Sequence, residues 1–334
     1  MSDIFFKHGM AEPILMLAPM EGITNSIFRD LIIQKGGMNF VATEFIRITT
    51  SRQKIKSFHR HSIPLQIQFM SAKPEELAAC LKFLKEKGTL LDTDWVDLNV
   101  GCPSKRVNAS GAGAALLLNP DKIISMIDSM REVHPGPLSL KTRVGYQSDE
   151  NYSQILMSLA KCPLDFITIH ARTKCAGFDG PVNLGYLKQA VESLPFPVIG
   201  NGDIWNADDA IKMLNETGVR GLMCGRGAIR NPLLFQQIYS RLNNKELVEN
   251  KHELIGFFFN LLSEYQNVGQ KKLGVFKEFS GWFSKHPLIG KDLFQAIKRS
   301  QSFDELQAKA IDYFGLKTSL NSSDHLVECS LSLN

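Results

Sequence analysis

The residues that could carry out chemistry are concentrated in one stretch, residues 95–117, WVDLNVGCPSKRVNASGAGAALL. An apolar run there ends at Gly101, and Cys102 follows beside Pro103. Glycine permits the positive φ angles and close backbone approach that such a loop requires. The stretch therefore predicts a buried strand followed by a loop that presents a thiol, an amide and two cations. A core cysteine is the alternative, because free cysteine is among the most buried residue types.

The elements that must position this thiol are eight short apolar runs, each followed by a turn and a helix-like segment. The runs occupy residues 14–19, 40–45, 64–69, 95–100, 137–143, 165–170, 196–201 and 221–225. Short runs bounded by Gly or Pro are typical of strands buried on both faces of a parallel sheet. Eight strands alternating with helices over about 230 residues predict an α/β fold, the (β/α)8 TIM barrel. A doubly wound open sheet is the alternative, and the lack of a GxGxxG motif disfavours it.

Helix boundaries in the sequence are marked by residues that favour the first turn. Thr24, Asn206 and Ser302 are predicted N-caps, and Pro74 is predicted to open a helix. The positions near residues 24, 74 and 206 place helices after predicted strands, as a barrel requires, whereas Ser302 lies in the helical region that follows.

Polar residues lie on or directly after nearly every predicted strand, toward its C-terminal end, and in a barrel these ends form the active face. One such residue can be satisfied structurally, but many in register are difficult to explain as packing, because unpaired buried polar groups are costly. The residues are Glu21, Glu44, Gln66, Gln68, Asn99, Cys102, Lys141, Arg143, His170, Arg172, Thr173, Asn201, Asp203 and Arg226.

The chain after the predicted barrel changes its periodicity. From about residue 250 to residue 314, apolar residues recur at helical spacing and no strand-like run occurs. We expect a catalytic barrel domain over residues 1–245, a small all-helical domain over residues 246–315, and a flexible tail over residues 316–334.

Two segments are rich in basic residues. Residues 271–299 contain seven Lys or Arg and two acids, and residues 46–61 contain five Lys or Arg and no acid. One segment is on the expected active face and the other on the helical domain, which fits a polyanion that contacts both. Two solvated charged faces are the alternative interpretation.

Composition narrows the class of protein. The chain of 334 residues is 44% hydrophobic and 22% charged, which is ordinary for a soluble enzyme, and its net charge is +4. Six cysteines without a CxxC motif or Cys/His metal spacing favour reduced thiols in the cytoplasm and disfavour a zinc site. The N-terminus does not resemble a signal peptide, and no apolar run approaches the ~20 residues of a membrane span. We expect a cytoplasmic monomer with no metal and no membrane partner.

The strand ends are suited to a flavin mononucleotide (FMN). Residues 201–203 and 225–227 follow the seventh and eighth strands, where barrels commonly bind phosphate through backbone N–H groups. Lys141 could place its charge against the electron-rich end of a flavin ring, and Gln68 could hydrogen-bond to the ring edge. Residues 18–20 could pack on the face of that ring.

Cys102 would then face the ring across a substrate. Hydride delivery to one carbon of an activated C=C bond requires a proton at the neighbouring carbon, and a thiol there could donate it. Asn99 offers the donor and acceptor pair that recognises an imide edge.

Several segments together resemble the tRNA-dihydrouridine synthase family. They are APMEGITNSIFRDLI, TEF, LQIQF, DLNVGCPSKRVNASGAGAALL, KTRVG, HART, VIGNGDI and CGRGAIRNPLLF. The LNxGCP motif is the most specific of these, and the helical region is similar to the family's C-terminal tRNA-binding domain. The resemblance implies an enzyme that uses FMN and NAD(P)H, with NADPH expected, to reduce a uridine in tRNA to 5,6-dihydrouridine. TEFIRI, KSFHR and NGDIW are similar to the branch that modifies position 16 of the D-loop, with Asp203 where that branch is expected to have Glu.

The resemblance also implies roles for individual residues. Cys102 is implied to be the proton donor. Contacts with FMN are implied for Ala18, Pro19, Met20, Gln68, Lys141, His170, Asn201, Gly202, Asp203, Gly225 and Arg226. Contacts with the substrate are implied for Asn99, Lys105, Arg172 and Thr173.

Three alternative functions remain at this point. The same reaction could occur at uridine 17 or 20 of the D-loop. A flavin oxidoreductase acting on a free pyrimidine would share the chemistry, but a small substrate requires neither the helical domain nor the basic segments. A tRNA-binding protein without catalysis would not require Cys102 and Lys141.

Overall fold

The computed structural model describes residues 4–49, 55–246 and 250–316. Eight parallel strands form its core, and they are β1 (Ile14–Leu17), β2 (Phe40–Ala42), β4 (Leu65–Met70), β5 (Trp95–Val100), β6 (Leu138–Arg143), β7 (Phe166–His170), β8 (Val198–Asn201) and β9 (Gly221–Cys224). β1 pairs with both β2 and β9, and β2 also pairs with β4, so the sheet closes into a ring. The predicted TIM barrel is confirmed.

The second predicted strand, residues 40–45, ends earlier than expected, and a separate short strand follows it. β2 ends at Ala42, and the chain pairs with β4 again as β3 (Ile46–Arg47), where Ile46 is opposite Phe69. Thr43 and Glu44 lie between the two short strands, and the Thr43 hydroxyl accepts a hydrogen bond from the Gln68 N–H at 3.0 Å. This part of the chain is therefore connected to β4 both by backbone pairing and by a side-chain hydrogen bond.

An aromatic cluster closes the N-terminal end of the barrel. Phe40, Trp95 and Phe166 each begin a strand, and they pack together with Phe5 of the short helix α1 (Ile4–Lys7). All four side chains are buried. Because this end is filled, a ligand can enter the barrel only from the opposite end.

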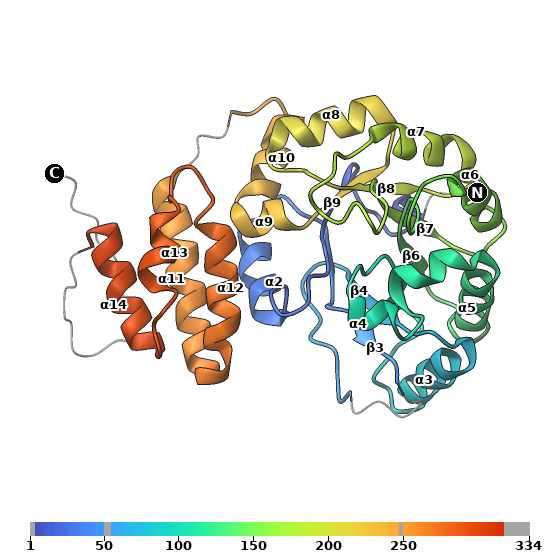
Figure 1. Ribbon diagram of the computed structural model, residues 1–334, viewed down its shortest axis with the longest axis horizontal. Helices are drawn as coiled ribbons and strands as arrows, with labels where there is room; N and C mark the ends of the chain where they lie inside the picture. Colours follow the sequence, from blue (N-terminus) through green and yellow to red (C-terminus); the bar gives the residue numbers. More distant parts are fainter. Residues whose placement is uncertain (1–3, 50–54, 247–249, 317–334) are drawn as a thin grey trace.

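Helices surround the barrel in the order expected for alternating strands and helices (Figure 1). The longer ones are α2 (Ser26–Gln34), α3 (Pro74–Glu86), α5 (Pro120–Val133), α6 (Tyr152–Leu159), α7 (Leu184–Ser193), α8 (Ala207–Thr217) and α10 (Leu234–Leu242). Three short helical turns closely follow two of the strands: α4 (Lys105–Asn108) and η1 (Gly113–Leu118) come after β5, and α9 (Arg226–Arg230) comes after β9.

One predicted helix cap is wrong. Asn25 caps α2, because its side chain accepts the N–H groups of Ile27 and Phe28. Thr24 instead accepts the N–H of Met20 at 2.8 Å and so closes the turn after β1. The predicted caps at Asn206 and Ser302 are confirmed, as is Pro74 at the first position of α3.

The C-terminal region consists of helices only, within the residues described after position 250. They are α11 (Lys251–Val268), the short turn η2 (Gln270–Lys272), α12 (Leu273–Phe283), α13 (Asp292–Ile297) and α14 (Phe303–Phe314). A cluster of phenylalanines, including Phe258, Phe276, Phe279 and Phe283, packs between α11 and α12.

This helical part packs directly on the barrel. Figure 1 shows α12 beside α2 and α9, and α11 contacts α2 while α12 contacts α9. A buried hydrogen bond of 2.7 Å from Asn25 Nδ2 to the Tyr265 hydroxyl crosses between the two parts. No helix among the described residues has the length and apolar character needed to span a membrane.

Candidate active site

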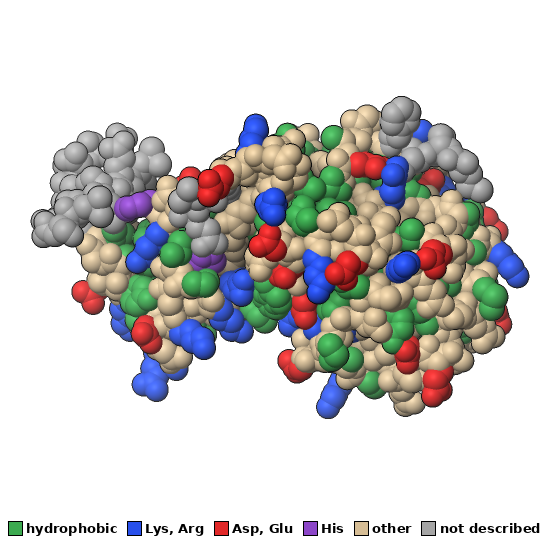
Figure 2. Space-filling model, turned by 90° about the horizontal axis from the view of Figure 1, so that it is seen from above, with side chains coloured by type: hydrophobic (Ala, Val, Ile, Leu, Met, Phe, Trp, Pro, Cys, Tyr) green, Lys and Arg blue, Asp and Glu red, His purple; other side chains and the backbone are tan. Residues whose placement is uncertain are grey.

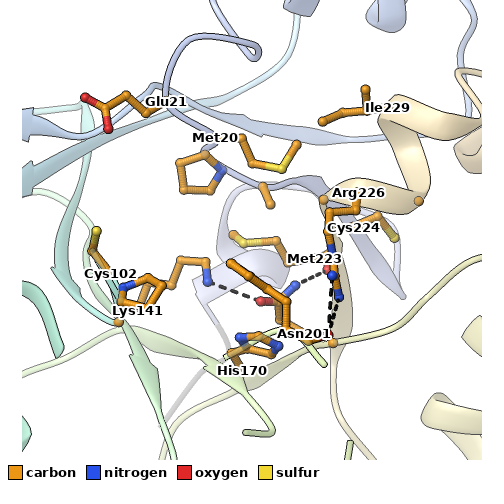
Figure 3. Close-up of a pocket in the computed structure, with 18 of the residues that line it drawn as sticks. Met20, Glu21, Cys102, Lys141, His170, Asn201, Met223, Cys224, Arg226 and Ile229 are labelled. Atoms are coloured by element: carbon orange, nitrogen blue, oxygen red, sulfur yellow. Dashed lines mark hydrogen bonds between the residues drawn. The ribbon is translucent and has the colours of Figure 1, made fainter. Parts of the chain in front are cut away.

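A cavity of about 640 Å³ lies at the C-terminal ends of the barrel strands. Most of the predicted site residues line it, and they are Ala18, Pro19, Met20, Asn99, Cys102, Lys141, His170, Asn201, Gly202, Asp203, Gly225 and Arg226. Figure 3 shows Cys102 and Lys141 toward one side, Arg226 on the other, and His170 and Asn201 between them. The fold therefore brings together residues from six strand ends that are up to 208 positions apart in the sequence.

Lys141 supplies a half-buried cation to the cavity. Its ammonium donates to Asn201 Oδ1 at 3.2 Å, and Asn201 Nδ2 donates to the Met223 carbonyl at 2.6 Å. Burial, and to a smaller extent the nearby cation Arg143, together lower the pKa of Lys141 to about 8. Lys141 is therefore mainly charged at neutral pH, and its charge can be lost at moderately alkaline pH.

His170 lies on the same side of the cavity and is buried. Burial is the main cause that lowers its pKa, and the cations Arg143 and Lys141 add to the effect. The imidazole is therefore neutral at pH 7 and offers one donor and one acceptor nitrogen.

Asp203 organises two arginines beside the cavity. Arg172 Nη1 donates to Asp203 Oδ1 at 3.0 Å, and Arg226 Nη2 donates to the same oxygen at 2.9 Å. Arg172 is buried and does not line the cavity, so its guanidinium serves the ion pair with Asp203. Arg226 lines the cavity and remains partly accessible, with 19% of its side chain exposed.

The surroundings of Arg226 include aromatic residues that sequence reasoning missed. Its guanidinium lies 4.7 Å from the ring centroid of Phe178, 5.1 Å from that of Trp205 and 5.8 Å from that of Trp282. Trp282 belongs to α12, and Glu278 of the same helix also lines the cavity. The sequence shows that Glu278 and Trp282 are four residues apart and therefore lie on one face of a helix. It does not show what that face contacts.

The Cys102 thiol is half-buried at the opposite side of the cavity. Burial raises the pKa of this thiol, and the nearby Glu21 carboxylate raises it as well. The thiol is therefore protonated at neutral pH and can donate a proton. Its backbone carbonyl is held by Asn108 Nδ2 at 2.9 Å and by the Ala114 N–H at 3.2 Å, which fixes the loop.

Four of the predicted site residues do not line the cavity: Gln68, Lys105, Arg172 and Thr173. Gln68 has no exposed surface and uses its amide inside the barrel, donating to Asp97 and accepting from Asn99. Lys105 is exposed at the start of α4, and Thr173 is half-buried in the loop after β7. The Thr173 carbonyl accepts from Arg143 Nη1 at 2.9 Å.

Arg143 was predicted at the active face without a specific role; it lines the cavity and connects two loops through hydrogen bonds. Its Nε donates to the Gly101 carbonyl at 2.9 Å, and its Nη1 donates to the Thr173 and Gly177 carbonyls at 2.9 and 3.0 Å. It therefore ties the Cys102 loop to the loop after β7. Burial lowers the pKa of Arg143 to about 10, so it remains charged at neutral pH.

The described residues of the two predicted basic segments differ in the cations that they expose. Arg60, in the first segment, pairs with Asp94 at 2.6 Å, and Arg52 and Lys54 lie outside the described residues. In the second segment the exposed cations are Lys271, Lys285, Lys291, Lys298 and Arg299. Figure 2 shows Lys and Arg side chains gathered along one edge of the helical part, at the left of the view.

Comparison with known proteins shows which family this chain matches. The family profile described as dihydrouridine synthase matches residues 16–312. The tRNA-dihydrouridine(16) synthase of Aquipseudomonas alcaligenes is 32% identical over 238 residues, which cover 67% of this chain and 74% of that protein. The tRNA-dihydrouridine(16) synthase of Haemophilus ducreyi is 30% identical over 317 residues, 89% of this chain and 94% of that protein.

A solved structure shares the fold alone. The 6-hydroxypseudooxynicotine amine oxidase of Pseudomonas geniculata N1 has a TM-score of 0.51 and 11% sequence identity, over 69% of this chain and 47% of that chain. The family match, in contrast, extends from β1 through the barrel and into α14. The chain belongs to the dihydrouridine synthase family.

Proposed function

We propose that this protein reduces uridine 16 in the D-loop of tRNA to 5,6-dihydrouridine, with FMN as its cofactor and NADPH as its reductant. The observation that carries the proposal is that a protonated thiol, Cys102, and a half-buried cation, Lys141, face one cavity at the barrel mouth. Position 16 is supported by the names of relatives that are about 30% identical over most of the chain.

The residues of the cavity fit FMN. Ala18 and Met20 provide an apolar wall, and Lys141 and Arg226 provide positive charge for an anionic ligand. Space beside that wall depends on Gly225, because a Cβ there would lie 3.3 Å from Met20 Sδ and 3.5 Å from Ala18 Cβ. When bound, FMN would supply the hydride that adds to one carbon of the uracil C=C bond.

Cys102 would supply the matching proton. Its Sγ holds the proton at neutral pH because burial and Glu21 both raise the thiol pKa. A positioned general acid contributes roughly 100- to 10,000-fold to such a step. The hydrogen bonds that hold the Cys102 carbonyl keep the thiol at the cavity wall while the substrate enters and leaves.

The exposed cations of the helical part would hold the tRNA phosphates. A D-loop uridine has to leave its stacked position to reach the cavity, at a cost of a few kcal/mol, and contacts away from the base must offset that cost. One of these exposed cations, Lys285, lies next to the cavity, because its ammonium is 3.7 Å from the ring centroid of Trp282, which lines the cavity.

The test is to incubate the purified protein with NADPH and a tRNA transcript that lacks modifications, then map dihydrouridine by mass spectrometry of nuclease fragments. We expect dihydrouridine at position 16, and far slower product formation with the Cys102→Ala variant. Product at position 17 or 20 would contradict the site assignment. Turnover of orotate in place of tRNA would contradict the proposed substrate class.

A further inference from the structure

A chain of hydrogen bonds runs from a buried carboxylate inside the barrel to the backbone of the Cys102 loop. Gln68 Nε2 donates to Asp97 Oδ2 at 2.7 Å, and Gln68 Oε1 accepts from Asn99 Nδ2 at 2.8 Å. Asn99 Oδ1 in turn accepts the N–H of Gly101 at 3.1 Å and the N–H of Cys102 at 3.0 Å. Asp97 and Gln68 have no exposed surface, so water does not compete for these bonds.

The two ends of this chain determine the orientation of both amides. An ionised carboxylate only accepts hydrogen bonds, and a backbone N–H only donates. The NH₂ group of Gln68 must therefore face Asp97, which turns its oxygen toward the NH₂ group of Asn99. If Gln68 were rotated by half a turn, oxygen would face oxygen at Asp97 and NH₂ would face NH₂ at Asn99. Like groups in contact in a buried site are costly, because each is left without a partner.

We propose that Asp97 is a positioning residue for the Cys102 thiol. Its carboxylate orients the amide of Gln68 and, through it, the amide of Asn99. Asn99 Oδ1 is thereby directed at the backbone N–H groups of the Cys102 loop. The carbonyl side of Cys102 is held separately, by Asn108 and Ala114. The position of the thiol at the cavity therefore depends on a carboxylate that does not line the cavity.

This arrangement assigns Gln68 and Asn99 to supporting the loop. Both hydrogen-bonding groups of Gln68 are directed at protein atoms, and Asn99 Oδ1 already accepts two backbone N–H groups. A reacting group displaced by 1 Å can lose on the order of 100-fold in rate, so loss of the chain should lower turnover without removing the thiol.

Gln66 provides a matched control for Gln68. Both lie on β4, have no exposed surface and donate to Asp97, with Gln66 Nε2 at 3.2 Å from Asp97 Oδ1. Gln66 also donates to Ser139 Oγ at 2.8 Å, on the side away from the thiol loop. Gln66→Met and Gln68→Met thus remove the same kind of buried amide, but only the second interrupts the path to Asn99.

The experiment compares these two variants of the full-length protein by two measurements. One is the rate at which iodoacetamide alkylates Cys102, followed by peptide mass spectrometry, and the other is steady-state reduction of tRNA. For Gln68→Met we expect an alkylation rate changed by at least about 3-fold and a kcat lowered by at least about 10-fold, with KM within about 2-fold. For Gln66→Met we expect both quantities within about 2-fold of wild type, with a similar loss of Tm. Equal effects of the two substitutions would overturn the proposal.

A second pair of variants keeps the test decisive if Gln68→Met does not fold. Asp97→Asn retains an oxygen that can accept from Gln68, and its new NH₂ group can face Gln66 Oε1, which has no partner among the described residues. Asp97→Leu offers no acceptor. We expect the altered alkylation rate in Asp97→Leu and its rescue in Asp97→Asn; a normal rate in Asp97→Leu would contradict the proposal.

The turnover measurement rests on the proposed function, whereas alkylation does not. If the wild type failed to reduce tRNA while the variants still differed in alkylation, the proposed function would fail and the positioning role of Asp97 would stand.

Discussion

The guanidinium of Arg226 lies 5.8 Å from the ring centroid of Trp282, and this contact joins the barrel to the helical part at the edge of the cavity. Arg226 opens α9, and α12, which carries Trp282, packs against α9. Glu278, one turn earlier on α12, lines the same cavity. The helical part therefore contributes directly to the wall of the candidate cofactor site.

We expect Trp282→Ala to weaken FMN binding by roughly 3- to 30-fold, because a cation–π contact contributes about 0.5 to 2 kcal/mol. The ring also helps to orient Arg226, which is proposed to face the anionic part of FMN. Fluorescence titration of FMN into the flavin-free protein measures the effect. Trp282→Phe keeps an aromatic face and should lose less. Equal FMN affinity in the alanine variant and the wild type would show that α12 is only a neighbour of the site.

We expect Cys102→Ala to retain FMN and tRNA binding but to lose roughly 100- to 10,000-fold in turnover, because the general acid is removed. Single-turnover measurements with reduced protein and tRNA would isolate this step. Cys175→Ala is the matched control, since Cys175 is an exposed free thiol that does not line the cavity. Wild-type turnover of Cys102→Ala at neutral pH would exclude the proton-donor role.

Lys141 should make FMN binding depend on pH. Its pKa is lowered to about 8, chiefly by burial and then by Arg143, so its positive charge disappears as pH rises through that value. We expect the affinity of the flavin-free protein for FMN to fall between pH 7 and pH 9. Lys141→Gln should bind FMN weakly and without this pH dependence. A wild-type affinity that is constant across the window would contradict the electrostatic role of Lys141.

The stability of the flavin-free protein should also depend on the protonation of Lys141. Unlike the affinity for FMN, the contribution of Lys141 to stability should rise with pH. The folded pKa of Lys141 lies below its ordinary value of 10.5, so between about pH 8 and pH 10.5 the folded state binds fewer protons than the unfolded state. The Lys141 contribution to the free energy of unfolding should therefore rise with pH in that window. Comparison of urea denaturation of the wild type and Lys141→Gln across the window isolates this contribution, and identical pH dependence in the two proteins would argue against a lowered pKa.

Asn25→Ala should destabilise the protein more than the loss of an ordinary helix cap. Asn25 caps α2 and also donates to the buried Tyr265 hydroxyl at 2.7 Å, so the substitution removes a cap and a hydrogen bond between the two parts of the protein. We expect a loss of roughly 2 to 4 kcal/mol in the free energy of unfolding. Asn206→Ala, which removes only the cap of α8, should cost about 1 kcal/mol. Urea denaturation compares them, and equal losses would mean that the bond to Tyr265 contributes nothing.

Binding of tRNA should fall steeply with salt concentration, and the exposed cations of the helical part should determine the slope. We expect each of Lys291→Gln, Lys298→Gln and Arg299→Gln to reduce the slope of log affinity against log salt by about one unit, if its charge neutralises a phosphate. Lys82→Gln and Lys212→Gln, on exposed positions of the barrel helices α3 and α8, serve as controls and should leave the slope unchanged. Equal slopes in all five variants would exclude this surface as the tRNA contact.

Local sequence determined the barrel. Each strand of a parallel barrel is buried on both faces, so it has to be a short apolar run, and eight such runs are visible without any knowledge of distant contacts. The polar residues that line the cavity were predictable for a related reason, because residues at or just after the C-terminal end of a barrel strand lie at the barrel mouth. Cys102, Lys141 and Arg226 were found in this way, and the structure places all three on one cavity.

Tertiary structure decided which partners these residues have. Thr24 and Asn25 are both good caps, and the choice of Asn25 coincides with its bond to Tyr265, 240 positions away. Gln68 was predicted on the third strand, where it lies, but only closure of the barrel brings its amide between Asp97 and Asn99. Trp282 has a helical pattern that predicts a buried face, and only the packing of α12 on α9 places that face at the cavity. The physical reason is that burial and backbone geometry act along the chain, whereas hydrogen-bond partners are selected by distances between segments that come together only when the chain folds.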